Sequence, residues 1–147
     1  LAGQTVWVAN LSEEQQGFWP LDVAQSTDGG IFVTGRHTPL NGGPLLKLTR
    51  EGEVAFWKFL NAGINTPFDI EPMPDGGAVL LADNQSSIAV VRVDAEGNVL
   101  WRKSGILDVD DGSERYDASA LAVDADGNIV IVGKGLTPRW YLGGVVQ

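Results

Sequence analysis

The sequence predicts an all-β protein built from three repeated units of four short strands each. One observation is a turn pattern, Asp-Gly between apolar segments, which occurs at Asp28, Asp75 and Asp126 with spacings of 47 and 51 residues. A second is the glycine content of 19 in 147 residues, nearly double the usual share and typical of chains with many tight turns. A third is that no long stretch has the 3.6-residue periodicity of an amphipathic helix.

The first hairpin of each unit surrounds this turn. Asp-Gly pairs supply the positive φ angles of tight turns, and the aliphatic residues on either side suit strands. The three copies occupy residues 22–35, 69–82 and 120–133. In the first two copies we expect strands at 23–26 and 31–34, and at 70–73 and 78–81.

A second hairpin motif follows the first. Residues 47–58 (KLTREGEVAFWK) match residues 92–103 (RVDAEGNVLWRK), with Glu-Gly at each turn. This predicts strands at 45–48 and 54–57 in the first unit, and at 88–93 and 99–101 in the second. Trp57 and Trp101, with Trp7 near the start of the chain, are assigned to one repeat position, where they are expected to pack between units.

A partial copy of the second motif at residues 3–8 indicates that the chain starts in a fourth strand. Residues 143–147 match 88–92, which indicates that it stops in a third strand. The units are therefore about 3–48, 49–93 and 94–147, each starting with the fourth strand of one sheet and continuing with three strands of the next. One helical turn is expected at Ser12–Gln15, where Ser and Gln have capping-box spacing.

The two hairpin motifs, repeated in this order, resemble the repeats of bacterial PQQ-like and WD40-like β-propellers. The resemblance covers nearly the whole chain and implies that each unit is a propeller blade of an exported protein, periplasmic or extracellular. No basic and apolar leader is found at the start, so any signal peptide is expected to have been removed. The third repeat departs most, with Ala120 where the others have Asp22 and Asp69.

Three blades do not close a ring, because closed propellers have four to eight. Three interpretations stay open: a part of a larger propeller, a half-propeller that closes head to tail with a second copy, and a β-sandwich or irregular sheet. In the ring interpretations the fourth strand of one chain completes the blade begun by its neighbour, which is a heterologous interface.

The composition excludes several classes of function. Ten basic and 19 acidic residues give a net charge of −9, which opposes binding to nucleic acid. The chain has no cysteine, which excludes a disulfide framework, a thiolate zinc site and a cysteine nucleophile. No apolar run approaches the length needed to span a membrane.

The propeller resemblance implies that binding sites lie on one face, on the loops after the second and after the fourth strand of each blade. The candidates come from the loops after the second strand. The candidate ligand-binding residues there are Arg36, His37, Asp83, Asn84, Arg139, Trp140 and Tyr141. His37 is the sole histidine and is expected to be an exposed loop residue, so no histidine-rich metal site is possible within this chain. Trp19 and Trp140 lie outside the repeat position, where an exposed ring can stack on a sugar or anchor a protein.

The densest acidic cluster gives a weak candidate calcium site at Asp108, Asp110 and Asp111, although its order is not that of an EF-hand. No catalytic residue is identified and no cofactor is predicted. The expected function is a non-catalytic scaffold or interaction module, with a protein partner or a second copy. The alternatives are binding of a carbohydrate or small ligand, and a fragment of a propeller enzyme, either a quinoprotein or a hydrolase.

Overall fold

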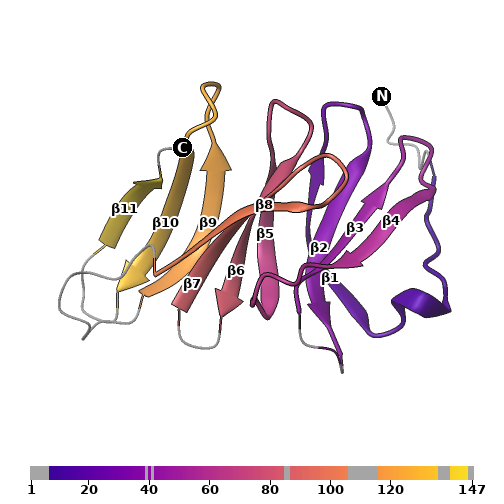
Figure 1. The fold of residues 1–147 in the computed structure, drawn as a ribbon, viewed down its shortest axis with the longest axis horizontal. Helices are drawn as coiled ribbons and strands as arrows, with labels where there is room; N and C mark the ends of the chain where they lie inside the picture. The colour runs from indigo at the N-terminus through magenta and orange to yellow at the C-terminus, as the bar shows by residue number, and fades with distance from the viewer. Residues whose placement is uncertain are drawn as a thin grey trace, which may run out of the picture.

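The computed structural model describes residues 7–38, 40, 42–84, 87–105, 116–135 and 140–145, with the backbone alone at 116, 134, 135 and 140–145. These residues form three antiparallel sheets that stand side by side in an open arc (Figure 1). The prediction of an all-β, propeller-type repeat fold is confirmed.

Each sheet is a meander in which consecutive strands pair. The first sheet contains β1 (Phe18–Gln25), β2 (Ile31–His37), β3 (Pro44–Leu48) and β4 (Val54–Phe59). The second contains β5 (Thr66–Pro72), β6 (Ala78–Asn84), β7 (Ser87–Val93) and β8 (Val99–Ser104). Within the described residues the third has three strands, β9 (Tyr116–Val123), β10 (Ile129–Gly135) and β11 (Trp140–Val145).

The segment before β1 contains a short 3₁₀ helix, η1 (Glu13–Gln15). The Gln15 side-chain oxygen accepts hydrogen bonds from the backbone N–H and the hydroxyl of Ser12, at 2.9 and 2.7 Å. The single helical turn predicted from this capping pattern is therefore confirmed. Residues 7–12 are not in a strand, whereas the sequence predicted one up to residue 8, and residues 3–6 lie outside the described part.

The strands begin earlier than the sequence predicted because the first strand of each sheet contains a β-bulge. In β1 the bulge falls between Pro20 and Asp22, and in β5 between Pro67 and Asp69. A bulge inserts one unpaired residue and lets the strand continue beyond it.

The register corrects one predicted equivalence. Lys47 pairs with Phe56 on β4, and Arg92 pairs with Trp101 on β8. Phe56 is thus the structural counterpart of Trp101, and Trp57 is not.

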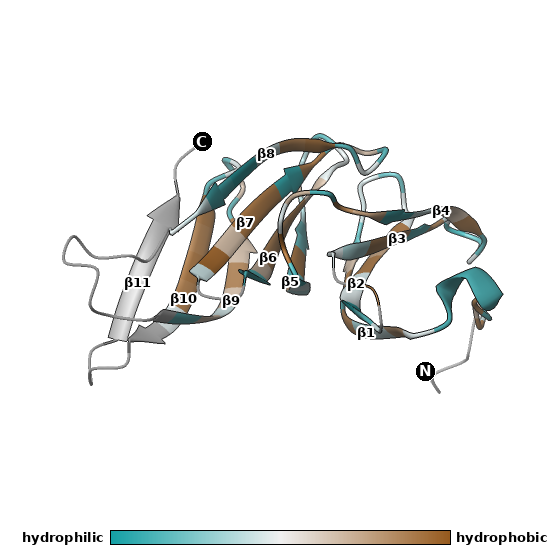
Figure 2. Ribbon diagram, turned by 60° about the horizontal axis from the view of Figure 1, so that its bottom comes forward, coloured by the Kyte–Doolittle hydropathy of each residue, from teal (hydrophilic) through white to brown (hydrophobic). Residues whose placement is uncertain are grey.

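The hydrophobic core lies between the sheets rather than within one. One cluster joins the first and second sheets and includes Phe32, Leu45 and Leu80. A second joins the second and third sheets and includes Val79, Leu81 and Ile131. Figure 2 shows hydrophobic residues concentrated on the middle strands β2, β3, β6, β7 and β10. Among the described residues no helix is long and apolar enough to cross a bilayer.

Candidate functional site

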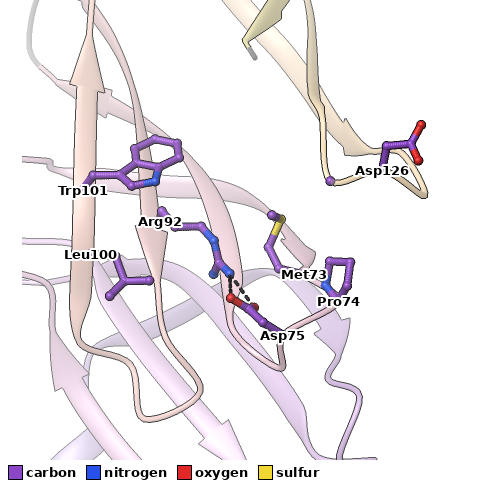
Figure 3. Close-up of a pocket in the computed structure, with 8 residues that line it drawn as sticks. Met73, Pro74, Asp75, Arg92, Leu100, Trp101 and Asp126 are labelled. Atoms are coloured by element: carbon purple, nitrogen blue, oxygen red, sulfur yellow. Dashed lines mark hydrogen bonds and ion pairs between the residues drawn. The ribbon is translucent and has the colours of Figure 1, made fainter. Parts of the chain in front are cut away.

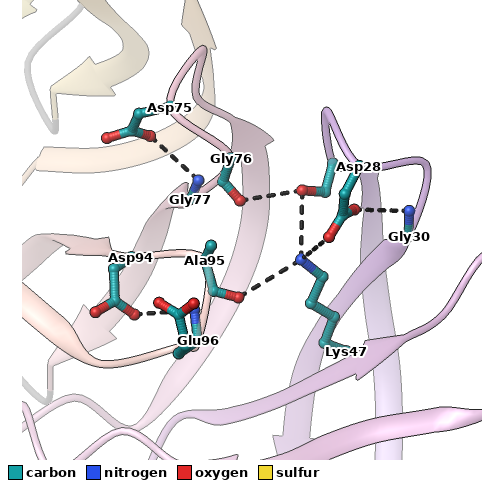
Figure 4. Close-up of polar contacts among 10 residues, drawn as sticks. Asp28, Gly30, Lys47, Asp75, Gly76, Gly77, Asp94, Ala95 and Glu96 are labelled. Carbon is teal, nitrogen blue, oxygen red and sulfur yellow. Dashed lines mark hydrogen bonds and ion pairs between the residues drawn. The ribbon is translucent and has the colours of Figure 1, made fainter.

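Polar side chains join the first and second sheets at the edge that carries the turns (Figure 4). Lys47, on β3, is only 6% exposed. Its Nζ donates to Asp28 Oδ2 at 2.7 Å and reaches the carbonyl oxygen of Ala95, in the second sheet, at 3.5 Å. Ser26 Oγ donates to the carbonyl oxygen of Gly76 at 3.0 Å across the same junction. Lys47 and Ser26 therefore hold the two sheets together.

Hydrogen bonds stabilise the ionised form of Asp28. The bond from Lys47 is the main cause, followed by the bond from the backbone N–H of Gly30, and together they hold the pKa of Asp28 below its ordinary value. The Asp28 carboxylate is therefore ionised at neutral pH.

Arg92, on β7, is the counterpart of Lys47 at the next junction (Figure 3). Its Nη2 donates to both carboxylate oxygens of Asp75, with Oδ2 at 2.6 Å. Its Nη1 donates to the carbonyl oxygens of Ala78, at 3.0 Å, and Val93. Burial alone would raise the pKa of Asp75, but hydrogen bonds from the backbone N–H of Gly77 and from Arg92 outweigh it and lower the pKa.

A cavity of about 360 Å³ lies beside this ion pair, between the second and third sheets. Figure 3 shows Leu100 and Trp101, from β8, on one side and Asp126, from the turn after β9, on the other. The full lining is Met73, Pro74, Asp75, Arg92, Leu100, Trp101, Asp126 and Gly127.

Carboxylates on the inner strands make a second, repeated link between sheets. Asp22 Oδ2, on β1, accepts the backbone N–H of Ile70, on β5, at 2.9 Å. Asp69 Oδ2, on β5, accepts the backbone N–H of Leu121, on β9, at 2.6 Å. The register places Ala120 at the same position in the third sheet, so this sheet has no carboxylate there. We call this contact the carboxylate link.

The two carboxylates lie close enough to interact. Burial raises the pKa of Asp69 to about 6; the N–H of Leu121 opposes this change, and Asp22 adds to it. Burial also raises the pKa of Glu71, with a further contribution from the charge of Asp22. No group of three or more histidine, aspartate or glutamate side chains within the described ranges could hold a metal ion.

Among the predicted ligand residues, Arg36 is placed against an exposed tryptophan. Arg36 is on β2 and pairs with Trp19 on β1. Its guanidinium carbon lies 5.8 Å from the centre of the Trp19 ring, which is 58% exposed. Arg36 and Trp19 therefore form one exposed cation–π pair.

His37 ends β2 and is 8% exposed, so the expected exposed loop histidine is in fact buried. Its ring packs on the edge of Phe59 with centroids 5.1 Å apart, and lies 6.1 Å from Trp57. Its Nδ1 has no hydrogen-bond partner among the described residues. These contacts make His37 part of an aromatic cluster that closes the end of the first sheet.

Asp83 and Asn84 end β6. Hydrogen bonding orients the Asn84 amide with its nitrogen toward the carbonyl oxygen of Gly63, at 2.9 Å, and its oxygen toward Arg102 Nη2, at 2.6 Å. Asp83 is exposed, and its carbonyl oxygen accepts the N–H of Asn65 at 2.9 Å. Both residues anchor the segment that leads into β5.

The other candidates cannot be placed in a site. Trp140 and Tyr141 open β11, where the backbone alone is described. Outside the described residues lie Arg139, Asp108, Asp110 and Asp111. The structure thus joins Arg36 to Trp19 and Asn84 to Arg102, in two different sheets.

The residues that link the sheets were missed as a functional set. Asp22 and Asp69 recur in the first hairpin motif, and Lys47 and Arg92 recur in the second. The signal was a polar residue at the same position of the first two repeats, but the repeats had been used only to predict the fold.

Comparison with known proteins supports the fold alone. No family model matches the sequence, and no curated protein matches it. The chain is similar to the crystal structure of a protein from Lactobacillus plantarum, with a TM-score of 0.57 and 19% identity. The match covers 95% of this chain and 44% of that protein, so this chain spans less than half of its length.

Proposed function

We propose that this chain is a non-catalytic interaction scaffold that presents an apolar strip to a protein partner. One observation carries the proposal: the edge strand β1 exposes Trp19 (58%), Leu21 (54%) and Val23 (58%), here called the β1 strip, which follows the strand past its bulge from one face of the sheet to the other. Grouped exposed apolar residues mark interaction surfaces. Tryptophan and arginine are also enriched among residues that dominate binding energy, and Arg36 lies beside Trp19.

The links between sheets support this proposal because a scaffold has to hold its surface in place. Lys47, which reaches the carbonyl oxygen of Ala95, and the carboxylate links of Asp22 and Asp69 join neighbouring sheets. The ion pairs of Lys47 with Asp28 and of Arg92 with Asp75 brace the turn within one sheet. A rigid strip loses little conformational entropy when it binds.

The finer family assignment is part of the proposal. The repeated Asp-Gly and Glu-Gly hairpins support blades of the PQQ-like and WD40-like type. That resemblance in turn supports an exported protein, in the periplasm or outside the cell.

Affinity capture with three forms of the chain tests the scaffold function. The wild type, the double variant Trp19→Ala/Leu21→Ser and the control Val54→Ser are immobilised and exposed to extract from the source cells. Val54 is a suitable control because it is 46% exposed on β4, outside the β1 strip. We expect the wild type and the control to retain the same protein in stoichiometric amount and the double variant to lose it. Equal retention by all three forms would contradict the proposal.

Carbohydrate binding is the second candidate, and the exposed Trp19–Arg36 pair favours it. An aromatic face can stack on a sugar ring while a guanidinium donates hydrogen bonds to hydroxyl groups. A glycan array with the wild type and Trp19→Ala separates the candidates. Binding to a defined glycan that the variant loses would support this second function, and an array without signal would exclude it for the glycans displayed.

A further inference from the structure

Trp7 occupies a place that the fold otherwise gives to the fourth strand of a neighbouring sheet. At the first junction, Phe56 of β4 packs on the second-sheet turn at Gly97, where an added Cβ would lie 2.6 Å from the Phe56 ring. Trp7 packs in the same way on the first-sheet turn at Gly52, where an added Cβ would lie 2.9 Å from its ring. Trp7 therefore contacts a turn of the first sheet in the same way that Phe56 contacts a turn of the second sheet.

In the described part of the chain, the third sheet has no such element. Its edge strand β11 pairs only with β10 in the described part of the chain. Trp7 lies at the first sheet, and β11 is at the opposite end of the arc in both ribbon views (Figures 1 and 2). One chain therefore cannot use the segment around Trp7 to extend its own third sheet.

The two ends of the arc expose residues whose counterparts are buried at the junctions. Val23 is 58% exposed, whereas its counterparts Ile70 and Leu121 are 2% and 5% exposed. We call the face around Val23 the head face.

The opposite end has the same property. Val132 is 37% exposed, whereas its counterparts Thr34 and Leu81 are fully buried. We call the face around Val132 the tail face. Each end thus has the surface of an inter-sheet junction without its neighbour.

At two positions of the described backbone, the tail face also lacks the charged residues found at the other junctions. Ala120 replaces the carboxylates of Asp22 and Asp69. Gly144, which pairs with Val130, takes the position of Lys47 and Arg92, which pair with Phe32 and Val79. A charged group left on an unpaired apolar face has to be desolvated again at each association. An uncharged face suits a junction between separately folded chains.

We propose that a second copy of this chain covers the tail face with its head face and adds the segment around its Trp7, as a fourth strand, to the edge of β11. Two copies joined head to tail in this way form a closed ring of six sheets. The inference rests on the proposed interaction function and names the partner of the β1 strip, which contains Val23.

The mass of the purified chain in solution is the first test. The monomer is 15.7 kDa. Light scattering after size exclusion is expected to give twice this mass for the wild type and for Val54→Glu, and the monomer mass for Val132→Glu. The two valines are 46% and 37% exposed in a single chain, so neither variant buries a charge on folding. A monomeric wild type, or a Val132→Glu dimer, overturns the inference.

Cross-linking identifies which faces meet. The chain has no cysteine, so introduced thiols are unique. A mixture of Val23→Cys and Val132→Cys chains, treated with a short bismaleimide, is expected to give a covalent dimer. Each variant alone should give no covalent dimer. The mixture of Val54→Cys and Val132→Cys should give none either. Self-linking of either variant, or no adduct in the mixture, overturns the head-to-tail arrangement.

These results also separate this inference from the scaffold function. A monomer that still retains another protein through the β1 strip overturns the second copy as partner and leaves the scaffold function intact. A head-to-tail dimer that retains no other protein supports this inference and restricts the scaffold function to self-assembly.

Discussion

Asp69 is the residue whose pKa is most directly subject to opposing effects. Its carboxylate accepts the backbone N–H of Leu121, which favours the charged form. Burial and the neighbouring Asp22 favour the neutral form and prevail, so the pKa is about 6. The link between the second and third sheets is therefore made by a group that changes charge near neutral pH.

We expect Asp69→Asn to alter how stability depends on pH. The folded-state pKa of about 6 exceeds the ordinary value of 3.8, so Asp69 favours folding fully below pH 3.8 and loses this effect as the pH rises through 6. Asparagine keeps an oxygen for Leu121 and does not ionise. The free energy of unfolding is measured by urea titrations between pH 4 and pH 8. Relative to that of the wild type, the value for the variant should increase as the pH rises.

Asp69→Ala is the matched control for this prediction. It removes the charge and also the acceptor, which leaves the N–H of Leu121 without its partner at a cost of about 1–3 kcal/mol. Alanine should be less stable than asparagine at every pH. If the stability of Asp69→Asn depended on pH as that of the wild type does, another group would be the cause of the dependence.

Arg92 yields a second prediction at this scale. Its side chain is 4% exposed and donates hydrogen bonds to Asp75 and to two backbone carbonyl groups. The Asp75 side chain, by contrast, is 64% exposed. Arg92→Met leaves the carbonyl groups with fewer donors and should cost about 1–3 kcal/mol in urea unfolding. Asp75→Asn should cost less, because its carboxylate is largely hydrated in any case. Equal costs would mean that the ion pair itself dominates.

At the scale of elements, the tight turns between the third and fourth strands of the first two sheets each pack against an aromatic ring, Trp7 at Gly52 and Phe56 at Gly97. Gly97 has φ +77° and an added Cβ would lie 2.6 Å from Phe56, whereas Gly76 has φ +88° and an added Cβ would meet Thr27 at 3.3 Å. Both alanine variants have to tolerate a left-handed backbone, at about 1 kcal/mol. Gly97→Ala should cost about 1–2 kcal/mol more in urea unfolding because it also clashes with the ring.

A double variant separates the two causes. Phe56→Leu removes the ring and should reduce the cost of Gly97→Ala toward that of Gly76→Ala. Strict additivity of Gly97→Ala and Phe56→Leu would show that the two residues do not interact in the folded protein.

The elements also show what sequence reasoning can reach. Asp-Gly and Glu-Gly pairs act locally, through the backbone angles of a turn, so the hairpins could be predicted from them. The bulge before Asp22 depends on pairing with β2, and the burial of His37 depends on rings from β4, which no local pattern encodes. The correspondence of Phe56, and not Trp57, to Trp101 was already present in the ungapped match of residues 47–58 to 92–103, and the strand register confirms it.

On the scale of the whole molecule, the internal junctions of the arc differ from the tail face. Charged side chains cross the internal junctions. At the first junction Lys47 and Asp22 both contact the second sheet. At the tail face, Ala120 and Gly144 take their positions. The candidate loop residues were predicted from the sequence, whereas this difference between junctions becomes visible only when the register aligns the three sheets.

This difference predicts the effect of salt on the head-to-tail dimer. Each chain carries a net charge of −9, so two copies repel one another, and salt screens that repulsion. The tail face brings no ion pair that salt could weaken. The dissociation constant from sedimentation equilibrium should therefore fall by about threefold or more between 20 and 200 mM NaCl. Val132→Glu should stay monomeric at both concentrations. A dissociation constant that rises with salt would mean that charged pairs hold the two chains together, and the uncharged tail face would then not be the surface that joins them.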